Sequence, residues 1–286
     1  MKFTSIDGKM GELDMRSGGT LLIGYDVESS GDPSIVRRFL QKAEEVHSDL
    51  SAPCTFFLVG KVVEANREEL AELRRRCDLF DYEQHTYSHM LLKTVCIDDG
   101  QKVSLVKGGP PEEIEREVSR TNQILAQHLG VECWGLTGPW GYYRGLCDRP
   151  DLLEILDRNG IRFLRTYARN EKDFQPVSFE IQPFWYKLQG FPNLLEMGIH
   201  GWQDVYWRSI NGWENTKGYL DLLKDTVDMV AKRGLVWSYG AHDWSAIKSD
   251  SEMSVMRGFI QYAKDRGLRM MDYRSFYLEA LKARAP

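Results

Sequence analysis

The sequence is poor in cysteine. Its 286 residues include five cysteines, an odd number, and no two of them form a C-x-x-C pair. Disulfide-stabilised scaffolds carry an even number of closely spaced cysteines and zinc knuckles need paired ones, so the sequence favours neither class. We expect buried free thiols at these positions: Cys54, Cys77, Cys96, Cys133 and Cys147.

Long apolar segments are also missing. No stretch approaches the roughly 18 consecutive apolar residues that a membrane-spanning helix needs. Residues 1–19 are polar and lack the apolar core of a secretory signal peptide. We therefore expect a cytoplasmic protein with no membrane contact.

The chain has no long run of basic residues. Lysine and arginine number 37, against 42 aspartates and glutamates, which gives a net charge of −5. Proteins that bind nucleic acid through phosphate contacts carry a basic surface, so we expect no nucleic-acid partner. The composition is 42% hydrophobic and 28% charged, as in globular proteins. Because no linker divides the chain, we expect one domain over residues 1–286.

Short apolar runs alternate with helical patterns along almost the whole chain. Asp32 and Pro33, for example, supply an N-cap and a first-turn proline for a helix that ends near Leu50. Strands that alternate with helices predict βαβ units and a parallel sheet. Seven or eight such units favour an α/β fold of the closed (β/α) barrel type, and glycine-rich nucleotide-binding motifs are missing. We expect strands at 20–25, 54–59, 79–84, 133–137, 162–167, 194–199, 235–239 and 269–272.

Two segments interrupt this alternation. Residues 90–109 contain an Asp99-Gly100 turn between two apolar stretches, which is a hairpin signal. Residues 168–193 form a longer insertion between two predicted strands. We expect both segments to be insertions in the barrel and not domains of their own.

Histidines collect where the predicted strands end. In a (β/α) barrel the carboxyl ends of the strands form the active site. Two of the six histidines lie within predicted helices, and the other four follow predicted strands: His85, His89, His200 and His242. This distribution indicates a functional site at the carboxyl end of the barrel.

His85 and His89 are four residues apart in the run His-Thr-Tyr-Ser-His. On a helix that begins directly after the strand, both imidazoles would share one face and could bind one metal ion. A carboxylate from another strand would complete the ligand set. The same spacing also occurs on surface helices, so the motif alone leaves both interpretations open.

Asp26 and Glu28 follow the first predicted strand. In an extended segment these two side chains point the same way, so both carboxylates could enter one pocket and have different roles there. The alternative is a solvated helix cap.

The run from His85 to His89, preceded by Glu83, resembles the second motif of the polysaccharide deacetylase family, also called the NodB-homology family or carbohydrate esterase family 4. The resemblance extends from about Leu21 to Phe276 and is most specific in this run. It implies a distorted (β/α) barrel and a hydrolase that acts on carbon–nitrogen bonds other than peptide bonds.

The resemblance also implies roles for single residues. Asp26 falls at the position of the family's catalytic base, and Glu28 falls near that of a metal-binding aspartate. His85 and His89 would be the other two metal ligands, and His242 falls at the general acid of the last motif. Zinc suits this ligand set, and cobalt or nickel would also fit.

One motif departs from the family pattern. The family's third motif begins with an arginine that orients the base, whereas this chain has Thr137 there, followed by Gly-Pro-Trp-Gly. Arg165, on the next predicted strand, and Arg144, in the same loop, are the candidates to replace it. The departure also leaves open a relative that has lost its activity.

Aromatic residues gather in the segments after the strands. We expect Pro139, Trp140, Trp202 and Trp244 to contact a sugar ring or another flat ligand. Tryptophan and tyrosine are also typical of subunit interfaces, so the sequence leaves open the alternative that the protein is a homo-oligomer. Two polar residues of the same region, His200 and Asp204, are either substrate contacts or solvated loop residues.

These patterns leave three functions. The first is a metal-dependent N-deacetylase of a small acylated amino sugar. The second is a hydrolase of cyclic amides or ureides, of the allantoinase or imidase kind. The third is a carbohydrate-binding relative without catalysis. The expected partner is therefore a small acylated sugar or a cyclic amide, because a cytoplasmic protein would not meet a cell-wall polymer.

Overall fold

The structure, a computed structural model, describes residues 18–98 and 101–284. The predicted turn at Asp99-Gly100 and most of the polar N-terminal segment lie outside the described residues.

The central sheet has nine strands among the described residues. Parallel pairing runs through the order β10-β1-β2-β3-β6-β7-β9, β8 lies antiparallel to β9, and β11 pairs with β1. The predicted α/β fold with a mostly parallel sheet is confirmed. The strands are β1 Thr20–Val27, β2 Cys54–Leu58, β3 Phe80–Gln84, β6 Gly135–Tyr143, β7 Phe163–Arg169, β8 Phe184–Tyr186, β9 Phe191–Glu196, β10 Val236–His242 and β11 Arg269–Met271.

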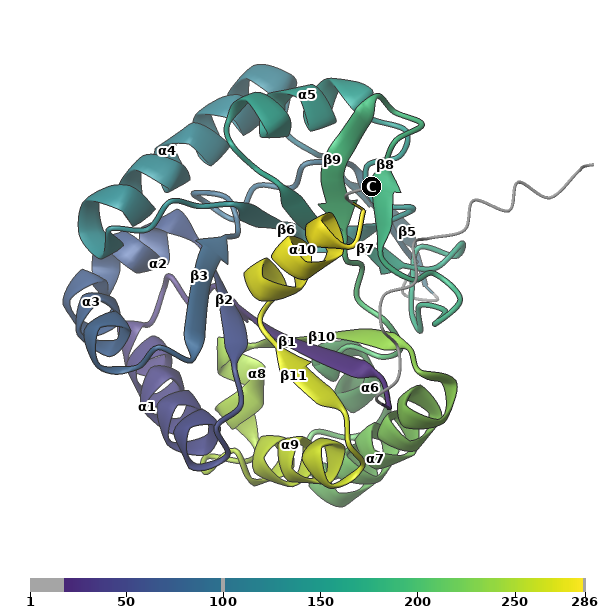
Figure 1. The fold of residues 1–286 in the computed structure, drawn as a ribbon. Helices are drawn as coiled ribbons and strands as arrows, with labels where there is room; N and C mark the ends of the chain where they lie inside the picture. Colours follow the sequence, from purple (N-terminus) through teal and green to yellow (C-terminus); the bar gives the residue numbers. More distant parts are fainter. Residues whose placement is uncertain (1–17, 99–100, 285–286) are drawn as a thin grey trace, which may run out of the picture.

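Helices surround the strands (Figure 1). The first begins as predicted, because Pro33 occupies its first turn and the Asp32 carboxylate accepts a hydrogen bond from the Ser34 N–H at 2.9 Å. The apolar faces of the helices pack against the outside of the sheet and form the larger core. The helices are α1 Pro33–Asp49, α2 Gly60–Ala65, α3 Arg67–Arg76, α4 Pro111–Leu129, α5 Pro150–Arg158, α6 Asp204–Asn211, α7 Thr216–Arg233, α8 Asp243–Lys248, α9 Ser254–Asp265 and α10 Tyr273–Lys282.

A second apolar cluster fills one end of the barrel. Leu22, Phe57 and Phe163 enter it from three strands, and Tyr273 and Phe276 of α10 complete it. Figure 1 shows α10 lying across this end. Because the amino ends of the strands are covered in this way, a ligand reaches the barrel interior from the carboxyl ends.

The strand ladder has a gap between β9 and β10 in the described part of the sheet. His200 spans it: its N–H donates to the Ser238 carbonyl at 3.0 Å, and its Nδ1 accepts from the Ser238 N–H at 3.1 Å. The Gln182 carboxamide likewise bonds both backbone groups of Val236. These contacts satisfy backbone groups of β10 that a neighbouring strand would otherwise pair.

The structure corrects several local predictions. The helix expected after the second strand is two helices that meet at Asn66, whose side-chain amide bonds the Val62 carbonyl. The strand expected over 133–137 runs on to Tyr143, with register shifts against β7. Short helices, α6 and α8, form where loops were expected.

All five cysteines are free, as predicted. Cys54 and Cys133 are buried, whereas Cys77, Cys96 and Cys147 are partly exposed, so the expected burial is wrong for these three. Within the described ranges, no helix combines the length and the hydrophobicity that crossing a membrane requires.

Candidate active site

Asp26 points into the barrel because β1 alternates between its two faces. Ile23 packs in the outer core and Leu22 in the inner one, so Gly24 and Asp26 also point inward. Strand β10 pairs with β1 in a register that puts His242 directly beside Asp26. His242 Nε2 lies 4.0 Å from Asp26 Oδ2.

Arg165 reaches Asp26 from β7 through the barrel interior. Its side chain is fully buried, and Nη2 forms an ion pair with Asp26 Oδ1. Nε donates to the Thr137 hydroxyl at 3.0 Å, and Nη1 donates to the Gly24 carbonyl at 3.3 Å. A Cβ at Gly24 would lie 2.6 Å from Nη1, so this close approach needs glycine. Arg144, the other candidate, is exposed and lines a different cavity.

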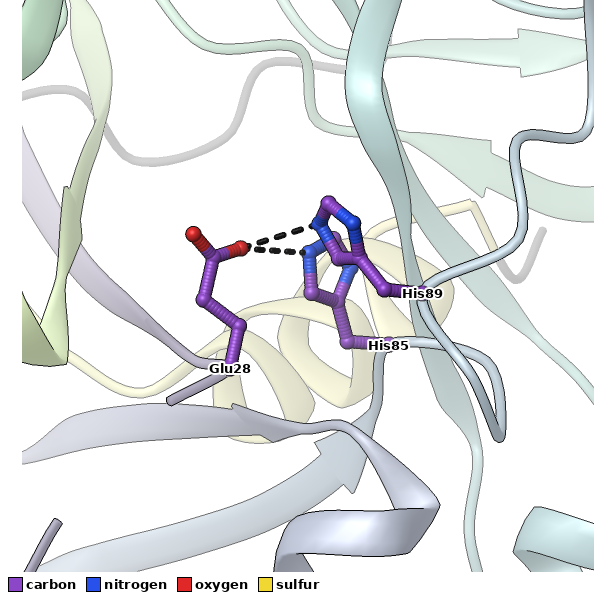
Figure 2. A group of neighbouring side chains, drawn as sticks. All are labelled: Glu28, His85 and His89. Atoms are coloured by element: carbon purple, nitrogen blue, oxygen red, sulfur yellow. Dashed lines mark ion pairs between the residues drawn. The ribbon is translucent and has the colours of Figure 1, made fainter. Parts of the chain in front are cut away.

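Glu28, His85 and His89 converge on one point (Figure 2). Glu28 Oε2 lies 3.4 Å from His85 Nε2 and 2.9 Å from His89 Nε2, and the three potential ligand atoms lie within 4.8 Å of one another. The second carboxylate oxygen, Oε1, accepts a hydrogen bond from Trp244 Nε1 at 3.0 Å. Burial raises the pKa of Glu28, but the positive charge of His242 and the contacts with the two histidine rings hold it well below its usual value.

The loop that carries the two histidines is not helical, which corrects the predicted helical pairing. Thr86 and His89 adopt left-handed backbone conformations, with φ of 59° and 64°, and these fold the chain back on itself. The ring of His85 is fixed by a hydrogen bond of 2.9 Å between its Nδ1 and the Thr137 carbonyl. Since a carbonyl only accepts, Nδ1 carries the proton and Nε2 presents a lone pair toward Glu28.

His242 is held by Asp204, the first residue of α6. His242 Nδ1 lies 2.8 Å from Asp204 Oδ1, its backbone N–H donates to Oδ2 at 3.0 Å, and the Ser245 hydroxyl donates to the same Oδ2. Burial lowers the pKa of His242, but Asp204, Glu28 and Asp26 together raise it to about 10. The imidazolium form is therefore favoured, and Nε2 faces Asp26.

A cavity of about 790 Å³ joins these groups. It is lined by residues of both predicted insertions and by five of the groups described above: Asp26, Glu28, His85, His89 and His242. The first insertion forms the predicted hairpin, with β4 Val95–Asp98 antiparallel to β5 Val103–Val106. The wall residues from the insertions are Ile97, Asp98, Ala168, Arg169, Lys172, Asp173 and Phe174.

Two of the four residues predicted to contact substrate line this cavity. Trp140, 40% exposed, lies in one wall, and Trp244 lies beside Glu28. Pro139 and Trp202 are not among the described lining residues. Trp202 packs edge-on against Phe174 instead.

His200 and Asp204 have positions that the sequence did not indicate. His200 is buried, its Nε2 lies 2.5 Å from the Ile181 carbonyl, and burial lowers its pKa to about 4. His200 bonds the backbone of β10 and is not among the residues that line the cavity, so it is neither of the two things expected of it. Asp204 is the partner of His242, and the only sequence signal was an acidic residue in the first turn of an unrecognised helix.

Comparison with known proteins finds a matching family model and matching solved structures. The model of the family described as polysaccharide deacetylase matches residues 22–163. No curated protein matches the sequence.

Solved structures share the fold at low sequence identity. A protein of Pseudomonas aeruginosa PAO1 described as a probable polysaccharide deacetylase is 14% identical, with a TM-score of 0.71 and coverage of 97% of this chain and 95% of that one. The PuuE allantoinase is 12% identical, with a TM-score of 0.69 and coverage of 98% and 97%. A Bacillus anthracis pseudoenzyme of carbohydrate esterase family 4 is 14% identical, with a TM-score of 0.52 and coverage of 91% and 66%.

The family match covers the segment that carries Asp26, Glu28, His85 and His89, and the shared fold extends over nearly the whole chain. On these grounds the chain belongs to the polysaccharide deacetylase family.

Proposed function

We propose that the protein is a metal-dependent hydrolase that cleaves a non-peptide amide C–N bond. The observation that carries this proposal is the meeting of two sets of side chains in one cavity. Asp26 and His242 lie side by side on paired strands, and the three potential metal ligands are next to them. Each residue of the first pair has its own buried partner, Arg165 for Asp26 and Asp204 for His242.

The donor set fits a divalent metal ion. Glu28 supplies a carboxylate oxygen, and His85 supplies a ring nitrogen whose lone pair is turned inward by the Thr137 carbonyl. Two imidazoles and one carboxylate suit zinc, with cobalt and nickel as alternatives. When bound, such an ion polarises a carbonyl group and lowers the pKa of water.

The chain's own residues would handle the two protons of the reaction. Asp26 takes a proton from the attacking water, and the Arg165 ion pair keeps its carboxylate oriented for that step. His242 gives a proton to the leaving nitrogen, which is otherwise too basic to depart. The net change is the addition of one water across the C–N bond.

Two substrate classes fit this chemistry. Membership of the family supports an acylated amino sugar, from which hydrolysis releases a carboxylic acid such as acetate and a free amine. A cyclic amide or ureide is the second class, and its ring opens without release of a second product. The ligand would lie between the aromatic walls of the cavity, next to Trp140 and Trp244.

The test is a hydrolysis assay with the metal as the variable. We expect protein stripped with a chelator to be inactive and to regain activity with zinc, cobalt or nickel. N-acetylglucosamine and hydantoin serve as probes, because acetate release reports the first class and ring opening the second. A protein that binds none of the three metals at micromolar concentration and hydrolyses neither probe would instead be a non-catalytic relative.

Replacement of Arg165 by methionine is expected to impair both stability and turnover. It would leave the buried carboxylate of Asp26 without its ion-pair partner, and breaking a buried ion pair costs about 3–5 kcal/mol of unfolding free energy. Urea denaturation measures this change. The matched control is Arg162→Met, which removes a half-exposed arginine at the start of the same strand and should cost less than about 1 kcal/mol. Equal effects of the two substitutions would contradict the assigned pairing.

A further inference from the structure

Gln203 lines the cavity with a side-chain amide that has no hydrogen-bond partner among the described residues. The residue is 6% exposed, and its backbone N–H donates to Gln175 Oε1 at 2.9 Å. Its carboxamide makes no hydrogen bond within the described part of the chain, and its two polar atoms are not among those sealed from solvent. Every other polar lining residue that is as deeply buried has a side-chain partner. Because these polar atoms face the cavity and keep access to solvent, both the donor and the acceptor of the carboxamide are available to a polar ligand.

The position of Gln203 is fixed by its surroundings. The Gln175 side chain that holds its backbone is itself buried and donates to the carbonyl of Ala168. Gln203 also directly precedes Asp204, the partner of His242. The free amide is thus carried by the same turn that orients the proton donor.

Two donors accompany Gln203 in the wall. The Tyr206 hydroxyl accepts a hydrogen bond of 2.7 Å from Arg169, which leaves the hydroxyl hydrogen of Tyr206 available. Arg169 is buried, and its partners are uncharged: this hydroxyl and the carbonyls of residues 140, 141 and 173. We call Gln203, Tyr206 and Arg169 the polar wall.

We propose that the polar wall recognises a cyclic amide or ureide and that Gln203 is its specificity-determining residue. A carboxamide presents one acceptor and one donor side by side, as when glutamine pairs with adenine. An amide within a small ring is held cis, so its N–H and C=O point the same way and match both groups at once. The acetamido group of an amino sugar is trans, and its N–H and C=O point in opposite directions. The acetamido group can therefore pair with only one of the two hydrogen-bonding groups of the Gln203 carboxamide.

This inference rests on the proposed hydrolase function for its catalytic meaning, but its binding part can be tested separately. The probes are hydantoin, a five-membered cyclic ureide, and N-acetylglucosamine. Binding to the zinc-loaded full-length protein is measured by titration calorimetry, and kcat and KM are measured by ring opening or acetate release.

We expect Gln203→Leu to weaken hydantoin binding, and to raise its KM, by about 10–100-fold, the discrimination typical of a two-point amide contact. The kcat should change little, because the contact is made equally in the ground state and the transition state. Gln203→Glu, which keeps the acceptor but loses the donor, should weaken hydantoin binding as well. The control is Asn211→Ala at the exposed end of α6, the helix that begins directly after Gln203, and it should leave hydantoin binding unchanged.

Three results would overturn the inference: a wild-type protein that does not bind millimolar hydantoin, a leucine variant that binds it normally, or an equal loss for both probes. Failure of the proposed function looks different. A protein that binds hydantoin through Gln203 but hydrolyses nothing with any metal would refute the hydrolase and leave the recognition intact. A protein that deacetylates N-acetylglucosamine but does not bind hydantoin would do the reverse.

Discussion

Replacement of His242 by asparagine is expected to lower kcat by about 10²–10⁴-fold, the usual contribution of a general acid. The register between β10 and β1 pairs His242 with Asp26, and the ring Nε2 of His242 lies 4.0 Å from Asp26 Oδ2. Asparagine can still donate its amide to Asp204 but cannot give a proton to the leaving nitrogen. Metal content and substrate affinity should therefore change little. Steady-state kinetics with a metal determination on the same sample provide the measurement.

Asp204→Asn separates the proton donor from the residue that positions it. Asp204 raises the pKa of His242, so its loss should lower that pKa. Because the acid must be protonated to act, the rate falls as the pH rises through this pKa, and the basic limb of kcat should move to lower pH in the variant. Asparagine at position 204 should thus retain activity at low pH, unlike asparagine at position 242. Turnover that is unaffected by His242→Asn would remove His242 from the mechanism, and His200 could not take its place because it is bonded to the backbone of Ser238 and does not line the cavity.

The second large effect expected is the loss of the metal site. His85→Ala or His89→Ala should abolish stoichiometric zinc binding and, with it, nearly all hydrolysis, since each removes one of three protein ligands. The barrel should still fold, because His89 is partly exposed and the inner core is formed by other side chains at the opposite end. Zinc titration by calorimetry and a circular dichroism spectrum report the two properties independently.

A matched histidine tests whether the effect is specific. His128 lies in the last turn of α4, away from the cavity, and His128→Ala should leave zinc stoichiometry unchanged. Glu28→Gln gives a finer comparison, because it keeps the shape of the side chain and its contact with Trp244 while it removes the charge. Zinc bound with normal stoichiometry by the His85 variant would show that the ion lies elsewhere.

The sequence by itself determined much of this protein. Alternating apolar runs and helix caps predicted the α/β fold, because both depend on neighbours in the chain. Asp26, Glu28, His85, His89 and His242 could be placed at one end of the barrel without coordinates. All parallel strands of a barrel end on the same side, so the residues that follow different strands meet there.

The tertiary structure decided which side chains pair. Two arginines were candidates for the ion-pair partner of Asp26. The position of Arg165 on β7 and the lack of a side chain at Gly24 allow Arg165 to reach it. Local sequence also suggested that a helix joins His85 and His89, whereas left-handed residues do so. Such a conformation is uncommon outside glycine and leaves no pattern in the sequence.

The tertiary structure also decided that Asp204 is the partner of His242 and that the amide of Gln203 faces the cavity. Asp204 begins a short helix and Gln203 directly precedes it, 38 and 39 residues before His242 in the chain. Nothing in residue spacing indicates whether such a side chain points to solvent, to a neighbour or into a cavity. That is settled by how β9, α6 and β10 pack, because hydrogen-bond partners are chosen by distances in space and not by separation along the chain.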